Sequence, residues 1–167
     1  MSLQKQTLVL AVLAGLTVPA PAWALLNTCV VASVPVAFPS YDGLSGATVT
    51  STGTVALTCT GVTVLGLTSV DVDYTIALST GGSSSYAARK MSWLTNTLSY
   101  NLYKDIGYSQ VWGDGTGGSS TVTGSIHQSG LLVTSVTVNI PVYASIPASQ
   151  KVPAGSYADT ITITVTY

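Results

Sequence analysis

The sequence predicts an all-β protein folded as a two-sheet sandwich of the immunoglobulin type. Three observations predict it: the composition, a strict alternation of apolar and polar residues, and turn signals between the alternating runs. The 167-residue chain is rich in Thr, Val and Tyr, contains 16 Gly and no Glu, and has only 7% charged residues. Helical proteins normally carry Glu, Lys and Ala in bulk, whereas Thr, Val and Tyr favour strands. The length suits one domain.

The same composition excludes two functional classes. A net charge of −1 and an isoelectric point near 5.4 exclude nucleic-acid binding that is driven by positive charge. Intrinsic disorder is also excluded, because 47% hydrophobic residues and a mean hydropathy of +0.50 can supply a core.

The N-terminus reads as an export signal. Lys5 is followed by an apolar run at residues 7–18 and by Ala22-Trp23-Ala24, a typical cleavage pattern. The alternative is a membrane anchor, but this run is too short to cross roughly 30 Å of hydrocarbon at about 1.5 Å per residue. We therefore predict a signal peptide at residues 1–24 and one domain at 25–167, with no membrane span after the signal is removed.

The strands are expected in chain order as follows. The first, at residues 29–38, contains Pro35, so it should lie at a sheet edge or carry a bulge. Residues 54–60 and 70–78 alternate apolar with polar side chains, which predicts strands with one buried face. Shorter strands are expected at residues 89–93, 98–104 and 110–112.

The last two expected strands have the clearest patterns. Residues 132–142 turn Val and Ile to one face, with Ser, Thr and Asn on the other. Residues 157–167 place Ile161, Ile163 and Val165 on one face and a row of Thr on the other. Gly-rich and Pro-rich turns separate the runs, and seven or eight strands at this spacing favour a sandwich.

Cys29 and Cys59 are the two cysteines of the chain. Export would place them in an oxidising compartment, where one pairing is possible. They flank two expected strands. A zinc site is a weak alternative, because two Cys and one His do not complete it.

A search for catalytic or metal chemistry finds no constellation. His127 is the single histidine, and no Gly-x-Ser-x-Gly elbow surrounds a serine. We interpret His127 as a solvated loop residue. Asp71 and Asp73 share one strand face without a visible third ligand, and the glycine cluster at 113–118 lacks the Lys-Ser/Thr of a phosphate loop. We predict no enzyme, no metal and no cofactor.

The C-terminal strand carries a second expectation. Its alternation runs to Tyr167, where a complete immunoglobulin-type domain would continue into a pairing strand. A long strand with one apolar face and no pairing partner exposes its backbone donors and acceptors together with hydrophobic side chains of the core. The alternative is a natural final strand that is covered by the first one.

Several ordered motifs carry a family resemblance over nearly the whole of residues 25–167. They are Cys29 with VAFPSYD at 36–42, GTVALTC at 53–59, YTIALSTG at 74–81, RKM at 89–91, LSYNLYKD at 98–105, VWGDG at 111–115, IPASQ at 146–150, and PAGSYADT at 153–160 with the strand that follows. Each motif alone is weak, but the ordered set resembles the spore coat U family, a domain also used by pilins of archaic chaperone–usher pili.

The resemblance implies an incomplete immunoglobulin-like sandwich that lacks its last strand, with one disulfide between Cys29 and Cys59. Its partners would be a periplasmic chaperone, an outer-membrane usher and neighbouring pilin subunits. The chain would pass through the periplasm to a fibre at the cell surface. By position, the strand-acceptor groove would be lined by two short sets of residues. These are Val34 and Val36 from the first strand, and Ile161, Ile163, Val165 and Tyr167 from the last.

One departure from the family pattern concerns the N-terminal tail. After cleavage at Ala24, residues 25–28 would precede Cys29 and would reach about 14 Å. That is too short to fill a partner's groove, so we expect a subunit that accepts a strand without donating one, or a coat protein that assembles otherwise. The alternative function is a secreted adhesive or carbohydrate-binding sandwich, whose exposed aromatic residues would be Trp93, Tyr108 and Trp112.

Overall fold

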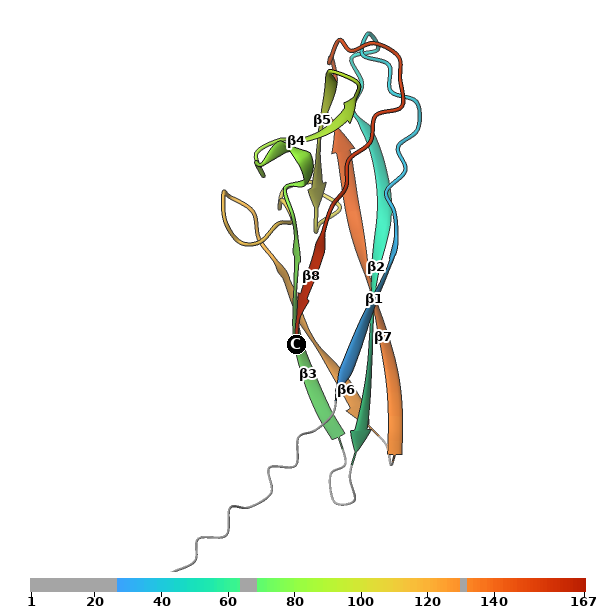
Figure 1. Ribbon diagram of the computed structural model, residues 1–167, viewed down its shortest axis with the longest axis vertical. Coiled ribbons are helices and arrows are strands. Elements are labelled where there is room, and N and C mark those ends of the chain that lie inside the picture. Colours follow the sequence, from blue (N-terminus) through green and yellow to red (C-terminus); the bar gives the residue numbers. More distant parts are fainter. Residues whose placement is uncertain (1–26, 64–68, 130–131) are drawn as a thin grey trace, which may run out of the picture.

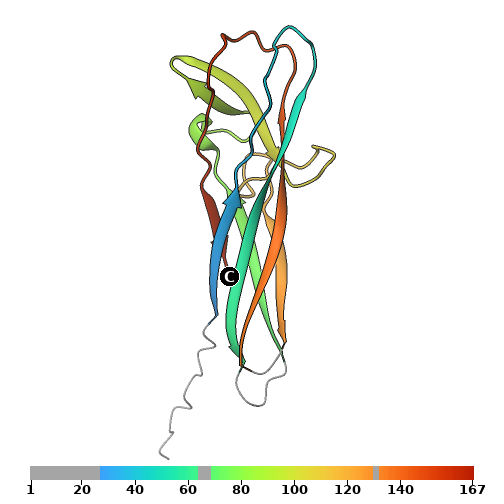
Figure 2. The same ribbon diagram turned by 90° about the vertical axis from the view of Figure 1, so that its right-hand side faces the viewer.

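The computed structural model describes residues 27–63, 69–129 and 132–167, which form an elongated sandwich of two antiparallel sheets (Figure 1 and, turned by 90°, Figure 2). Within these ranges there is no α-helix. The strands are β1 (Thr28–Val34), β2 (Val49–Thr63), β3 (Ser69–Leu78), β4 (Arg89–Trp93), β5 (Asn96–Tyr103), β6 (Val122–Ser129), β7 (Leu132–Ile146) and β8 (Ile163–Thr166), with a 3-10 turn, η1, at Gly81–Ser83. The predicted all-β sandwich is confirmed.

The larger sheet has the order β1-β2-β7-β5-β4. Its centre is the ladder between β2 and β7, two strands of 15 residues each. The alternation in the sequence sets the faces: Val55, Leu57 and Cys59 are buried, while Thr58 forms a hydroxyl pair with Thr137 of β7 on the outer face at 2.7 Å.

The smaller sheet has the order β6-β3-β8. β3 buries Val72, Tyr74 and Ile76, as its alternation predicts. β6 was not predicted, and the short strand expected at 110–112 is wrong, since Val111 and Trp112 form isolated bridges only.

Two strand ends differ from expectation. β1 stops at Val34, directly before Pro35, and lies at a sheet edge, so the predicted effect of the proline is borne out while the strand is shorter than 29–38. At the C-terminus, only Ile163–Thr166 form a strand, although the alternation begins at residue 157. The reason is the partner: Ile163 pairs with Leu78, the last residue of β3, so residues 157–162 have passed the end of that ladder.

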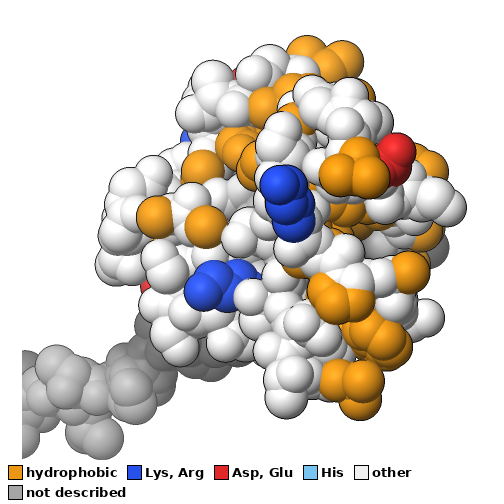
Figure 3. Space-filling view, turned by 90° about the horizontal axis from the view of Figure 1, so that it is seen from above, with side chains coloured by type: hydrophobic (Ala, Val, Ile, Leu, Met, Phe, Trp, Pro, Cys, Tyr) orange, Lys and Arg blue, Asp and Glu red, His pale blue; other side chains and the backbone are white. Residues whose placement is uncertain are grey.

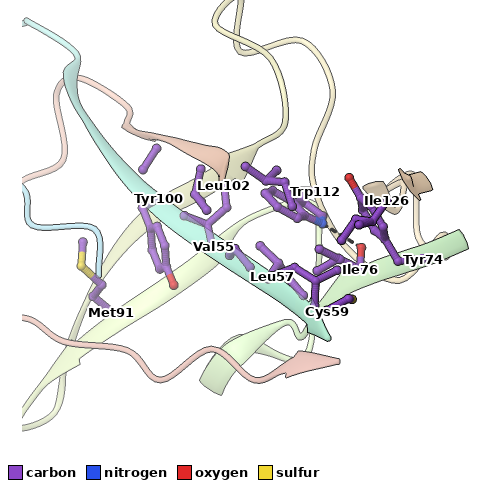
Figure 4. Close-up of a cluster of buried hydrophobic side chains, with 14 of the residues drawn as sticks. Val55, Leu57, Cys59, Tyr74, Ile76, Met91, Tyr100, Leu102, Trp112 and Ile126 are labelled. Atoms are coloured by element: carbon purple, nitrogen blue, oxygen red, sulfur yellow. Dashed lines mark hydrogen bonds between the residues drawn. The ribbon is translucent and has the colours of Figure 1, made fainter. Parts of the chain in front are cut away.

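The core runs between the sheets, and Figure 4 shows its two parts. Toward one end, Trp112 is completely buried and donates its indole N–H to Ile76 O at 3.0 Å. Toward the other, Met91, Tyr100 and Leu102 of β4 and β5 line the inner face of the larger sheet. The disulfide between Cys29 and Cys59 joins β1 to β2 at directly paired positions, which confirms that prediction.

A buried arginine links the sheets. Arg89 of β4 is fully buried, and its guanidinium donates to Ser79 O (2.8 and 3.0 Å), Trp112 O (2.7 Å) and Asn101 Oδ1 (2.7 Å). It also lies 5.1 Å from the centre of the Tyr86 ring. Burial lowers the pKa of Arg89 from its usual value. Since the hydrogen-bond acceptors are neutral, this residue holds loops and strands together rather than pairing with a carboxylate.

Candidate functional site

A large cleft opens at the end of the sandwich that is uppermost in Figure 1, which is called the loop end from here on. There the larger sheet extends past the ends of β3 and β8, and its inner face is covered by two irregular segments instead of strands (Figure 1). One segment continues β1 and the other precedes β8. The cavity between them has a volume of about 1240 Å³ and is bordered by residues 33–44 on one side and by 151–159, Ile161 and Ile163 on the other.

The floor of the cleft is the hydrophobic core itself. Val55, Leu78, Met91, Tyr100 and Leu102 line it, and each is less than a tenth exposed. All of these except Leu78 belong to the larger sheet, so this part of its inner face borders the cavity between the two irregular segments rather than a second sheet. Sequence reasoning named the walls but missed this floor, because the β4–β5 hairpin gives no sign of which cavity its inner face borders.

The walls are fixed to the sandwich by polar contacts. Ser51 Oγ donates to Ala37 O at 2.6 Å, which holds the first wall against β2. At the rim, Tyr41 donates its hydroxyl to Pro147 O (3.0 Å) and accepts a bond from Gln150 N (2.8 Å). An edge-to-face contact between Phe38 and Tyr100, with centroids 6.1 Å apart, joins the first wall to the floor.

The second wall is held by Asp159. Its Oδ1 accepts hydrogen bonds from Gly82 N (3.0 Å) and Thr160 N (2.8 Å), while its Oδ2 accepts one from the hydroxyl of Tyr100 at 2.7 Å. Burial, and then this bond to Asp159, raise the pKa of Tyr100, so its phenol stays protonated as the donor. The wall is pinned again where Ser92 of β4 and Ala158 exchange two backbone bonds.

The six predicted groove residues fall into two groups. Val36, Ile161 and Ile163 are half-buried and line the cleft, and Val34 borders it while lying 65% exposed opposite Thr54. Val165 packs against the core without lining the cleft, and Tyr167 is 55% exposed.

The edge of β8 has its own geometry. Ser79 donates its N–H to Thr162 O (3.0 Å), and Ser79 Oγ accepts a bond from Thr162 N (2.9 Å). Because bonding directions alternate along an antiparallel ladder, Thr164 also faces β3, whereas the backbone groups of Ile163 and Val165 point away from it. No strand in the described ranges pairs with that outer edge of β8.

The surface around the cleft carries little charge. Among the residues that line the cleft, three are charged: Asp42, Lys151 and Asp159. Seen from above in Figure 3, the loop end shows hydrophobic side chains spread among uncharged ones, with few charged groups between them. A ligand of this cleft would be recognised by apolar side chains and backbone bonds rather than by charge.

The catalytic and metal candidates do not assemble into a site. His127 lies on β6, not in a loop as predicted, and its Nδ1 is 2.7 Å from Asp71 Oδ1 of the neighbouring strand, with both side chains more than 60% exposed. Asp73 lies on the same outer face of β3. In the parts of the chain that the structure describes, no three His, Cys, Asp or Glu residues could hold a metal ion.

The aromatic residues of the alternative function are mostly packed. Trp112 is fully buried, so its predicted exposure is wrong. Trp93 is half-buried against Tyr157, and Tyr108 packs edge-to-face on Tyr103. No helix among the described residues has the length and hydrophobicity to span a bilayer. The predicted signal peptide at residues 1–24 lies outside the described residues.

Comparison with known proteins identifies the family. Residues 16–164 match the Spore Coat Protein U domain. The chain belongs to the Spore Coat Protein U domain family. It is 30% identical to Protein U of Myxococcus xanthus over 137 residues, which are 78% of this chain and 70% of that protein.

A solved structure shares the fold of this Spore Coat Protein U domain. It is a chain in the CsuC–CsuE complex of chaperone and tip adhesion subunit, from the archaic chaperone–usher Csu pili of Acinetobacter baumannii. The TM-score is 0.50 at 20% sequence identity over 85% of this chain. This chain spans about 40% of the length of that chain.

Proposed function

We propose that the chain is a non-enzymatic structural subunit of a secreted surface fibre or coat, and that its cleft accepts a β-strand from another chain. The partners would be a periplasmic chaperone, an outer-membrane usher and neighbouring subunits. The chain would be exported through the periplasm to the cell surface. Membership of the Spore Coat Protein U domain family and the fold shared with the Csu pilus complex support this proposal.

The observation that carries the proposal is the cleft of about 1240 Å³ with core residues on its floor, beside an edge of β8 that none of the described strands pairs with. An added strand needs these two features together: a free edge for backbone hydrogen bonds and pockets for alternate side chains. Each large apolar side chain that enters the cleft would contribute about 1.5–3 kcal/mol. The ordering of the strand offsets part of this gain.

The two walls differ in what they offer such a strand. Pro35 and Pro39 lie in the first wall and have no N–H to donate. On the other side, the backbone groups of Ile163 face outward from β3. The ladder would therefore form along β8, while the first wall contributes side-chain packing through Val36 and Phe38.

The direction of transfer follows from the predicted processing. Cleavage after Ala24 would leave residues 25–28 ahead of the disulfide-bonded Cys29, too few to fill a cleft of this kind. We therefore propose that the mature chain accepts a strand rather than donating one.

The test is strand binding by the mature chain. The probe is a synthetic peptide of about ten residues with Val at every second position and Ser or Lys between. The control peptide has the same composition with its Val residues contiguous. We expect the alternating peptide to form a one-to-one complex by native mass spectrometry and to raise the unfolding temperature, and the control to do neither. A stable, soluble monomer that binds neither peptide would refute strand acceptance.

A further inference from the structure

The cleft occupies only one half of the sandwich. Val55 of β2, Leu78 of β3 and Ile163 of β8 line it. The next inward-facing residues toward the other end, Leu57 and Ile76, do not line it and have no exposed surface. The boundary thus crosses both sheets at one level, and the two halves are here named the open half and the closed half.

The closed half already contains a complete core. Trp112 fills it and is tied to Ile76 O by its indole N–H. The Cys29–Cys59 bridge holds the edge strand β1 against β2, and Gln128, which is fully buried, donates to Cys59 O at 2.9 Å. We do not expect the closed half to open for an inserted side chain, because the disulfide and hydrogen bonds hold it together and a packed core tolerates added volume poorly.

The open half lacks such a filling. Its floor residues Met91, Tyr100 and Leu102 face the cavity, and its walls are irregular segments held at separate points by Asp159 and Tyr41. Figure 4 shows the contrast: Trp112, Ile76 and Ile126 crowd together, whereas Met91 and Tyr100 lie apart at the other end.

From this asymmetry we infer that the cleft recognises side chains from only one half of the accepted strand. Large apolar residues are required where the strand passes Ile161 and Ile163 over the open half. Where the strand passes Val165, its backbone can pair with β8 but its side chains lie over the closed half, so their identity matters little. The inference rests on the proposed strand acceptance and specifies the partner as a segment with apolar alternation confined to one end.

A scan of the alternating peptide tests this. Each Val of the peptide is replaced in turn by Ala, and the affinity of the mature chain for each variant is measured. We expect losses of about tenfold per position, equal to about 1.4 kcal/mol, at consecutive Val positions toward one end, and losses below about twofold at the other end. The expected pattern does not depend on the direction in which the peptide binds.

Two matched variants of the chain give a second readout. Ile161→Ala shortens a side chain that lines the cleft, and Val165→Ala shortens one on the same face that does not. We expect I161A to weaken binding of the parent peptide about tenfold and V165A to leave it within about twofold, with circular dichroism showing that both variants fold.

The outcomes separate the two proposals. If the parent peptide does not bind, strand acceptance itself fails. If it binds and every Val position is equally sensitive, or if V165A weakens binding as much as I161A, side chains are recognised along the whole strand. The inference that only one half of the strand is recognised is then wrong.

Discussion

Replacing Arg89 with methionine tests whether a buried guanidinium with neutral partners stabilises this sandwich. The substitution removes every donor to Ser79 O and Trp112 O, two backbone carbonyls for which no other hydrogen bond is seen among the described residues. Asn101 Oδ1 still accepts a bond from Leu102 N at 3.0 Å. An orphaned buried acceptor costs about 1–3 kcal/mol, so two carbonyls give about 2–6 kcal/mol of lost stability.

An opposing effect reduces this loss. Burial disfavours the charged guanidinium, as its lowered pKa indicates, and methionine removes that desolvation penalty. We expect the lost hydrogen bonds to outweigh the removed desolvation penalty, because the two carbonyls are fixed by the chain on either side and cannot turn to new donors. The expected net loss of stability is about 3 kcal/mol, in the lower half of the range estimated for two unsatisfied acceptors.

The assay is urea unfolding of residues 25–167, followed by tryptophan fluorescence. A loss of about 3 kcal/mol lowers the midpoint by about 1–2 M. Arg89→Lys should fall between wild type and R89M, because an ammonium lacks the planar fork that reaches several acceptors. The control is Lys90→Met on the exposed face of the same strand, which should stay within about 0.5 kcal/mol. If R89M proves as stable as K90M, desolvation outweighs the hydrogen bonds and the reasoning is wrong.

Three further predictions concern the rest of the chain. The double variant Cys29→Ser/Cys59→Ser should lose roughly 3–4 kcal/mol for a bridge of sequence separation 30, and a reductant should destabilise wild type but not this variant; equal stability would contradict it. The side-chain and backbone hydrogen bonds from Thr116 lower the pKa of Asp114 below its usual 3.8, which NMR titration can check. T116V should raise this pKa only part of the way back, because it removes the hydroxyl bond and keeps the backbone N–H bond; no change would contradict the assignment. The stabilisation is present above the unfolded-state pKa and is lost as the pH falls through the lower folded-state pKa. The intact mass of the exported chain should match cleavage after Ala24, and any other N-terminus changes the length of the tail.

The sequence predicts those parts of the fold where one strand face is wholly apolar. In β3 the alternation is clean: the inward positions from Val72 to Leu78 are buried as expected, and Val70 is half-buried. In β6 the inward positions include Gly124 and Gln128, so the hydrophobic period disappears even though Gln128 is fully buried through its bond to Cys59 O. A buried polar residue whose side-chain amide donates to a distant carbonyl cannot be recognised from local pattern.

The groove residues show the same limit in another form. Alternation places Ile161, Ile163, Val165 and Tyr167 on one face, which is a local property that the sequence carries. Whether that face meets a cavity or a filled core depends on what lies opposite, and Trp112 settles this from a distant loop. The sequence therefore indicates which side chains point inward, but not that the cleft ends between Ile163 and Val165.

The two halves of the sandwich are linked in their energetics. Where the larger sheet borders a cleft instead of a second sheet, opposing strands contribute less packing, and here the disulfide, the buried Trp112 and the Arg89 hydrogen bonds hold the sandwich together. Arg89 sits between the halves: its β4 neighbour Met91 lines the cleft, while its acceptor Trp112 belongs to the closed core. The closed half can thus hold the sheets in register without an added strand, which would let the open half keep the shape that the proposed partner strand recognises.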